Sequence, residues 1–172
     1  MELFTLGEGH YSERDVQETV EAMIRDVFRE VMDVELADPF PRLSYAEAMR
    51  RFGSDKPDLR IDLELVDIAE HVRACGFKVF ADWAVEATGR VAALRLPSAS
   101  NWSRKQIDDI AAHAAKFGAK GLAWVKVEDR AKGRDGISSP IAKFLDDATL
   151  TVVLDAASAQ TGDLLLFGAG PW

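Results

Sequence analysis

Residues 118–145 constrain the fold more than any other part of this 172-residue chain. Gly118 follows a helical pattern of apolar residues and is a typical residue for closing a helix. The apolar run 122–127 then predicts a strand, and a basic, Gly-rich loop follows at 128–136. The chain returns to apolar character at 141–145. This stretch therefore predicts a helix and a strand in succession, with a charged loop at their edge.

Two helices are predicted before this stretch by their caps and their apolar spacing. Ser12 and Asp15 form a variant of the capping box at the start of a long helix over 12–32. Ser44 and Glu47 form a full capping box for a second, short helix that ends at Gly53. One side of the first helix carries an apolar stripe made of Val16, Val20, Met23, Val27 and Val31.

The remaining elements follow from periodicity and from flanking Gly and Pro residues. The patterns predict a helix at 63–74, a short strand at 77–80, a loop at 82–89, a strand at 90–96, a helix at 103–117, a helix that begins at Asp146 or Asp147, and a buried strand at 163–167. A sheet with packed helices is the economical way to bury these faces. The predicted class is α+β, a two-layer sheet with helices on one face, preceded by a helical connecting segment. The predicted domains are 1–75 and 76–172.

Charge is distributed unevenly along the chain. The formal net charge is −8, which differs from the basic character of proteins that grip nucleic acid nonspecifically. Residues 1–76 carry a net charge of −9, whereas residues 104–134 carry a net charge of +4. A polyanion would therefore be expected to bind the middle of the chain.

The composition also limits the compartment and the chemistry. Cys75 is the only cysteine, so an intrachain disulfide and a zinc site built on cysteine pairs are both excluded. No apolar run approaches the ~20 residues that span a bilayer, and no signal peptide pattern opens the chain. We therefore expect no membrane partner and a cytoplasmic location.

No assembled active site can be found in the sequence. The usual nucleotide-binding, hydrolase and zinc-protease motifs are absent, and the three histidines lie in different elements. We predict no catalytic residue and no metal ligand. Cations in the middle of the chain are candidate phosphate contacts, and a solvated surface is the alternative interpretation. These candidates are Arg104, Lys105, Lys120, Arg130, Lys132 and Arg134, with Lys56 and Arg60 as candidates in the connecting loop.

Several motifs in one colinear run resemble a known family. They are GRVAALRLP at 89–97, SRKQID at 103–108, GAKGLAWVKV at 118–127, SPIAKFL at 139–145 and GDLLLFGA at 162–169. Together they resemble the GAD insertion domain of bacterial-type aspartyl-tRNA synthetases, which some tRNA-dependent amidotransferase subunits share. FPRLSYAEA at 40–48 and FGSDKPDLR at 52–60 resemble the segment that joins the catalytic domain to this insert.

The resemblance implies a role in class II aminoacylation, in which a homodimeric enzyme uses ATP and Mg to attach aspartate to tRNA. This chain departs from the family pattern in what it lacks. It has no counterpart of the motif 2 arginine or the motif 3 segment, and residues 4–9 lack the Gln and Asp of the family's substrate-binding strand. We therefore expect a fragment that is inactive alone and holds no cofactor. A natural truncation, an excised domain and an altered gene product all fit this expectation, and tRNA specificity stays open.

A different class of function is the main alternative. The chain could be a stand-alone module with the GAD fold that binds tRNA weakly or binds another protein, with the basic segment 104–134 as its contact surface. A small-molecule sensor is a third alternative that no residue pattern supports. In each case the apolar stripe of helix 12–32 needs a partner, so self-association is expected.

Overall fold

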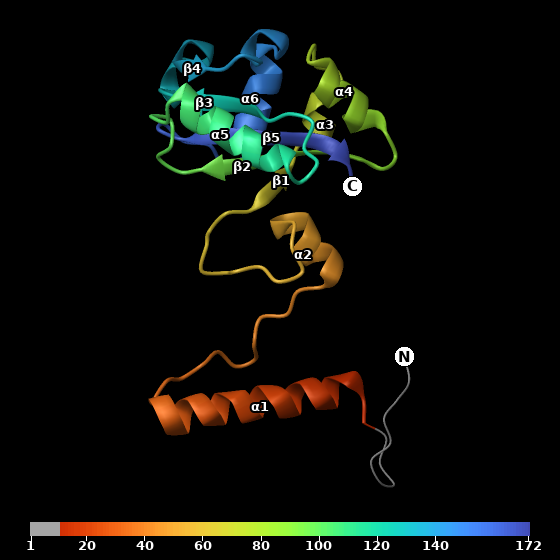
Figure 1. Ribbon diagram of the computed structural model, residues 1–172, viewed down its shortest axis with the longest axis vertical. Helices are drawn as coiled ribbons and strands as arrows, with labels where there is room; N and C mark the ends of the chain where they lie inside the picture. The colour runs from red at the N-terminus through yellow and green to blue at the C-terminus, as the bar shows by residue number, and fades with distance from the viewer. Residues whose placement is uncertain (1–10) are drawn as a thin grey trace. The chain divides into compact units, whose positions relative to one another are not determined.

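The structure is a computed structural model that describes residues 11–172. The chain divides into two compact units, Met1–Ser44 and Tyr45–Trp172 (Figure 1). The predicted domain division near residue 75 follows a change in sequence character and stays a prediction. The departure noted at residues 4–9 lies outside the described residues.

The described residues of the first unit, 11–44, contain one long helix, α1 (Glu13–Met32). The predicted capping box is present, because Asp15 N donates to Ser12 Oγ and Ser12 N donates to the Asp15 carboxylate. Arg25 pairs with Asp38, and Arg42 Nη2 lies 3.0 Å from Glu21 Oε1. The segment after the helix is therefore tied back to the charged side of α1. No residue of the helix is buried.

The second unit is built on one antiparallel sheet of five strands in the order β1-β2-β5-β3-β4. The strands are β1 (Leu65–Asp67), β2 (Gly89–Leu96), β3 (Ala123–Val127), β4 (Ile137–Ser138) and β5 (Leu164–Pro171). β5 lies in the centre and pairs with β2 along its whole length and with β3 over its first half. Residues of β5 therefore pair with residues that precede them by 38 to 82 positions.

Each face of the sheet packs against its own helices. Leu165 and Phe167 of β5 belong to the larger core, together with residues of α3 (Ala69–Val72), α4 (Lys78–Val85) and α6 (Asp147–Ala156). Leu164 and Leu166 point to the opposite face, where Ile107 of α5 (Arg104–Ala115) covers them. Figure 1 shows α5 lying across the sheet. The α+β class is confirmed. The predicted placement of the helices on one face was wrong: helices pack on both faces because β5 is apolar on both sides.

Several local predictions were wrong between residues 63 and 89. The segment predicted as a helix at 63–74 contains strand β1 and the short helix α3. Pairing of Leu65 with Leu94 of β2 outweighs the helical spacing, because a cross-strand ladder depends on tertiary context. The predicted strand at 77–80 is the start of α4, which continues through the first half of the predicted loop at 82–89. A short apolar run fits a strand and a buried helix equally well.

The other predicted helices and strands are present to within a few residues, and the loop predicted at 128–136 contains the 3₁₀ helix η1. The second helix is α2 (Tyr45–Phe52), α5 begins after the Ser103 cap, and Asp146 caps α6. Gly118 has a φ of +95° and follows α5, as its predicted role at a helix end requires. The predicted strand at 163–167 extends to Pro171. Two short 3₁₀ helices complete the unit, η1 (Arg130–Gly136) and η2 (Ala142–Phe144).

A buried carboxylate connects the start of β5 to the end of β2. Asp163 is 3% exposed and accepts hydrogen bonds from Arg95 Nε at 2.6 Å, Ser98 N at 3.1 Å and Gln160 N at 2.9 Å. A buried charge requires such partners, since an unpaired one is costly. The pairing therefore holds β5 in register with β2.

Removing the Phe167 side chain should destabilise the second unit far more than removing an exposed phenylalanine. Phe167 is 1% exposed and contacts the ring of Phe80, so Phe167→Ala leaves a cavity and is expected to cost about 3–5 kcal/mol. Phe117 is 79% exposed, so the control Phe117→Ala should change stability by less than about 0.5 kcal/mol. Urea unfolding of both variants measures the difference. Equal losses would contradict the central position of β5.

Candidate functional site

The basic loop between β3 and β4 is a compact turn. Glu128 N and Asp129 N both donate to the carbonyl oxygen of Gly136, at 2.8 and 3.0 Å. A Cβ atom at Gly136 would lie 1.9 Å from the carbonyl oxygen of Asp129, so only glycine fits at this position. Within the loop, η1 brings Arg130, Lys132 and Arg134 around one small hollow of 360 Å³.

The two arginines of the loop have structural partners. The Arg130 guanidinium lies 2.5 Å from the carboxylate of Asp155 in α6. Arg134 pairs with Asp147 and also donates to the carbonyl oxygens of Ala142 at 2.8 Å and Leu145 at 2.5 Å. Arg134 therefore closes the chain segment between β4 and α6. Both guanidinium groups therefore already bind acceptors within the fold.

Lys132 has a local partner. Its ammonium lies 3.2 Å from the carboxylate of Asp129, which also accepts a hydrogen bond from Ala131 N at 3.0 Å. The hydrogen bond from Lys132, followed by the one from Ala131, holds the pKa of Asp129 below its usual range. The charge of the loop is thus largely balanced by carboxylates.

The start of α5 carries two more candidate residues. Arg104 Nε donates to Asp108 Oδ1 at 3.0 Å, and its guanidinium carbon lies 5.7 Å from the ring centre of Trp124. Lys105 is exposed and has no ion pair within the described residues. Ser103 caps the helix through Gln106, so the backbone amides of the first turn are partly satisfied. Lys105 is the more accessible charge at this end.

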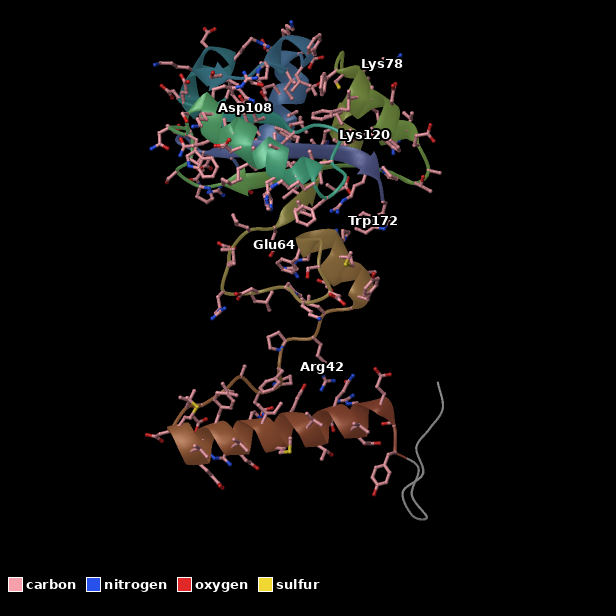
Figure 2. The ribbon with its side chains drawn as sticks, viewed as in Figure 1. Arg42, Glu64, Lys78, Asp108, Lys120 and Trp172 are labelled. Atoms are coloured by element: carbon pink, nitrogen blue, oxygen red, sulfur yellow. The ribbon has the colours of Figure 1, made fainter. Side chains whose placement is uncertain are left out.

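Lys120 shares a cavity with Arg104. This cavity has a volume of about 530 Å³, and it lies between α4, α5 and the loop that precedes β3. Figure 2 labels Lys120 on that loop and Asp108 on α5. Lys120 is exposed and forms no ion pair with another described residue. Of the six candidate cations predicted between Arg104 and Arg134, Lys105 and Lys120 are therefore the two without a carboxylate partner within residues 11–172.

Of the two candidate cations in the connecting loop, Arg60 has a carboxylate partner and Lys56 has none among the described residues. Arg60 Nη2 lies 2.6 Å from Asp58 Oδ2, and this contact lowers the pKa of Asp58. Lys56 has no ion pair among the described residues, and its backbone N–H donates to Ser54 Oγ. The eight predicted cations thus do not form one site. Three hollows with different lining residues are involved: one beside Arg130, Lys132 and Arg134, one that Arg104 and Lys120 share, and one beside Lys56 in the connecting loop.

Nothing in the described chain resembles a metal centre. No group of three or more His, Cys, Asp or Glu side chains in residues 11–172 has the arrangement of metal ligands. Across the same residues, no helix combines the length and apolar character needed to span a bilayer.

The structure also shows a cluster that the sequence reasoning missed. Arg90 Nε donates to Asp67 at 3.2 Å, its guanidinium lies 4.3 Å from the ring centre of Trp172, and it also donates to the carbonyl oxygen of Arg50. These groups come from α2, β1, β2 and the chain end. Arg90 and Trp172 line an apolar groove of about 750 Å³ between α2 and α5. No local motif marks this cluster, because its members are far apart in the sequence.

Comparison with known proteins agrees with this fold. The profile of the GAD domain family matches residues 81–172, which is more than half of the chain. The chain belongs to the GAD domain family. The matched region begins within α4 and contains β2 to β5, so the whole GAD match lies in the second unit.

Curated relatives extend the similarity beyond the GAD domain. The chain is 58% identical over 160 residues to the aspartate-tRNA ligase of Xanthomonas campestris pv. campestris, a match that covers 93% of this chain and 26% of the relative. It is 57% identical over 158 residues to the aspartate-tRNA ligase of Stenotrophomonas maltophilia, with 92% and 26% covered. The chain thus spans about a quarter of the length of these relatives. The match includes the α1 and α2 regions as well as the GAD domain.

Asp129 caps the start of η1 through the hydrogen bond from Ala131 N, and this carboxylate should make the free energy of unfolding depend on pH. Its folded pKa is lowered, so it stabilises the fold above about pH 4, and this contribution is lost as the pH falls through the folded pKa. Asp129→Asn should therefore be less stable than the native chain at pH 7, and the difference should shrink below about pH 4. Urea unfolding at several pH values measures this.

Lys132→Met provides the control for the pH effect. It removes the larger cause of the lowered pKa and keeps the hydrogen bond from Ala131, so the pH dependence should become weaker and not vanish. A constant difference between Asp129→Asn and the native chain from pH 7 to pH 3 would contradict the assignment.

Proposed function

We propose that this chain serves as a non-catalytic part of an aspartate-tRNA ligase, in which the GAD domain is an insertion carried on the connecting segment. The observation that supports this most is a match of 58% identity over 93% of the chain. The parent activity would be ATP-dependent attachment of aspartate to tRNA, with ATP and Mg bound elsewhere in a homodimeric, cytoplasmic enzyme. The chain itself would hold neither cofactor.

The geometry of the described residues supports a non-catalytic role. The cations that could stabilise a transferring phosphate are mostly engaged by carboxylates, as in the Arg130–Asp155 and Arg134–Asp147 pairs. An active site needs donors that are preorganised toward the reacting group and not already used by the fold. The strong internal pairing of these arginines fits a structural function.

A weak contact with tRNA is the finer part of the proposal. Lys105 and Lys120 are exposed, and no carboxylate of the described residues pairs with them. Such lysines bind phosphate as point charges and give affinity without sequence recognition. Lys56 is a third candidate of this kind in the connecting loop. The paired residues Arg60, Arg104, Arg130, Lys132 and Arg134 would contribute less, since each must first leave its carboxylate.

Self-association through α1 is a further part of the proposal. Its apolar stripe is exposed, with Met23 at 57% and Val31 at 77%. A contiguous apolar stripe on an amphipathic helix is typical of a contact surface. A second copy of α1 offers the same stripe and would bury it symmetrically.

The isolated chain should not catalyse aspartate-dependent exchange between ATP and pyrophosphate. The full-length Xanthomonas campestris relative, assayed alongside, provides the positive control. A chimera that carries this chain in place of the matched 160 residues of that relative should retain aminoacylation, because 58% identity preserves the fold. Robust exchange by the isolated chain would refute the non-catalytic role. A folded but inactive chimera would refute the equivalence of the two segments.

Any binding to tRNA should be weak and sensitive to salt. If Lys105 and Lys120 supply two phosphate contacts, affinity should fall about tenfold between about 50 and 200 mM salt. The variant with Lys105→Glu and Lys120→Glu should bind more weakly and lose most of this dependence. Lys143→Glu makes a charge change of the same kind outside the predicted set and serves as the control. A filter-binding titration that shows no retention at low salt would rule out this contact.

A further inference from the structure

An apolar groove crosses one face of the sheet in the second unit. Its volume is about 750 Å³, and it lies between α2 and α5. Leu94 and Leu166 lie on its floor, while Met49 of α2 and Ile110 of α5 form its walls. Figure 2 labels Trp172 at the end of β5, where it borders the groove. The groove is therefore part of the face that α5 covers only in part.

The width of the floor matches one helix. The lining runs from Leu65 of β1 across β2 to β5, which are three adjacent strands. Neighbouring strands lie ~4.8 Å apart, so the uncovered floor is ~10 Å wide, which is the diameter of an α-helix. The apolar face of a sheet is buried by a second layer, and a helix between α2 and α5 would complete that layer.

Two glycines on the floor have no role in the internal packing. Gly168 and Gly170 lie in β5 without a positive φ, and a Cβ atom at either position would meet no atom within 4 Å. Glycine weakens the interior of a strand and often marks the close approach of another backbone. The missing side chains therefore leave space above β5 for an occupant that lies directly on the strand.

The charge of the groove favours an uncharged, apolar occupant. Arg90 is the only charged side chain among the described residues that line it. Its guanidinium is already engaged by Asp67 and by the ring of Trp172. No cation is left over for a phosphate, so the groove complements an apolar surface and not a nucleic acid.

We propose that this groove receives one amphipathic helix from the part of an aspartate-tRNA ligase polypeptide that lies outside the region matched by this chain. The matched region is 26% of the Xanthomonas campestris relative, so most of that polypeptide is available to supply the helix. Such a helix would place apolar residues at i, i+3, i+4 and i+7 against the floor. This inference rests on the proposed function and adds a partner surface to it.

Overlapping fluorescent peptides that cover the unmatched part of the Xanthomonas campestris relative test the proposal. Each peptide is titrated against the full chain, with binding followed by fluorescence anisotropy and helix formation by circular dichroism. We expect one contiguous segment to bind and to gain helix. Gly168→Leu and Gly170→Leu fill the groove and should weaken binding at least tenfold. Gly121→Leu is the matched control, because Gly121 has equally open space and lies outside the groove.

Each result decides the question. Failure of all peptides to bind, equal binding of a scrambled peptide, or unchanged binding to Gly168→Leu and Gly170→Leu would overturn the proposal. Dimers in light scattering that Gly170→Leu dissociates would assign the groove to a second copy of the chain and overturn it as well. The exchange assay and the chimera test the proposed function without any peptide, so failure of the groove and failure of the function can be told apart.

Discussion

The second unit depends on the burial of β5 between two apolar layers. Leu164 and Leu166 pack toward α5, while Leu165 and Phe167 pack toward α3, α4 and α6. Both long edges of the strand are also used, because β2 and β3 pair with it, and β1 and β4 join the sheet only through those two strands. The buried carboxylate of Asp163 secures the beginning of this strand. The complete sheet therefore requires β5 at its centre.

Carboxylates of α6 neutralise the two arginines of the basic loop, so these arginines hold the loop against the helix. Counted along the sequence, residues 104–134 have an excess of cations. In space, Asp147 and Asp155 of α6 approach Arg134 and Arg130 and remove much of that excess. Exposed pairs of this kind contribute little stability individually, yet they occupy the donors that a phosphate would need. The location of the carboxylates, and not the number of lysines and arginines, sets the capacity of the loop to bind a polyanion.

Two apolar surfaces of this chain are not covered by other described residues. The stripe on α1 is exposed along the helix, and the groove between α2 and α5 leaves part of a sheet face without a covering layer. Burial of apolar area is the dominant favourable contribution to association. Both surfaces fit the proposal that the chain works within a larger ligase polypeptide, of which the similar segment is about a quarter.

The sequence by itself determined the features that depend on neighbouring residues. The caps at Ser12 and Ser103, the helix end at Gly118, the strand at 90–96 and the family resemblance all follow from short patterns. Only the tertiary structure decided that Leu65 pairs with β2, that α4 is a helix, and that Arg130 and Arg134 pair with carboxylates of α6. The physical reason is that strand pairing, burial on two faces and ion pairing join residues tens of positions apart, and no local pattern records those partners.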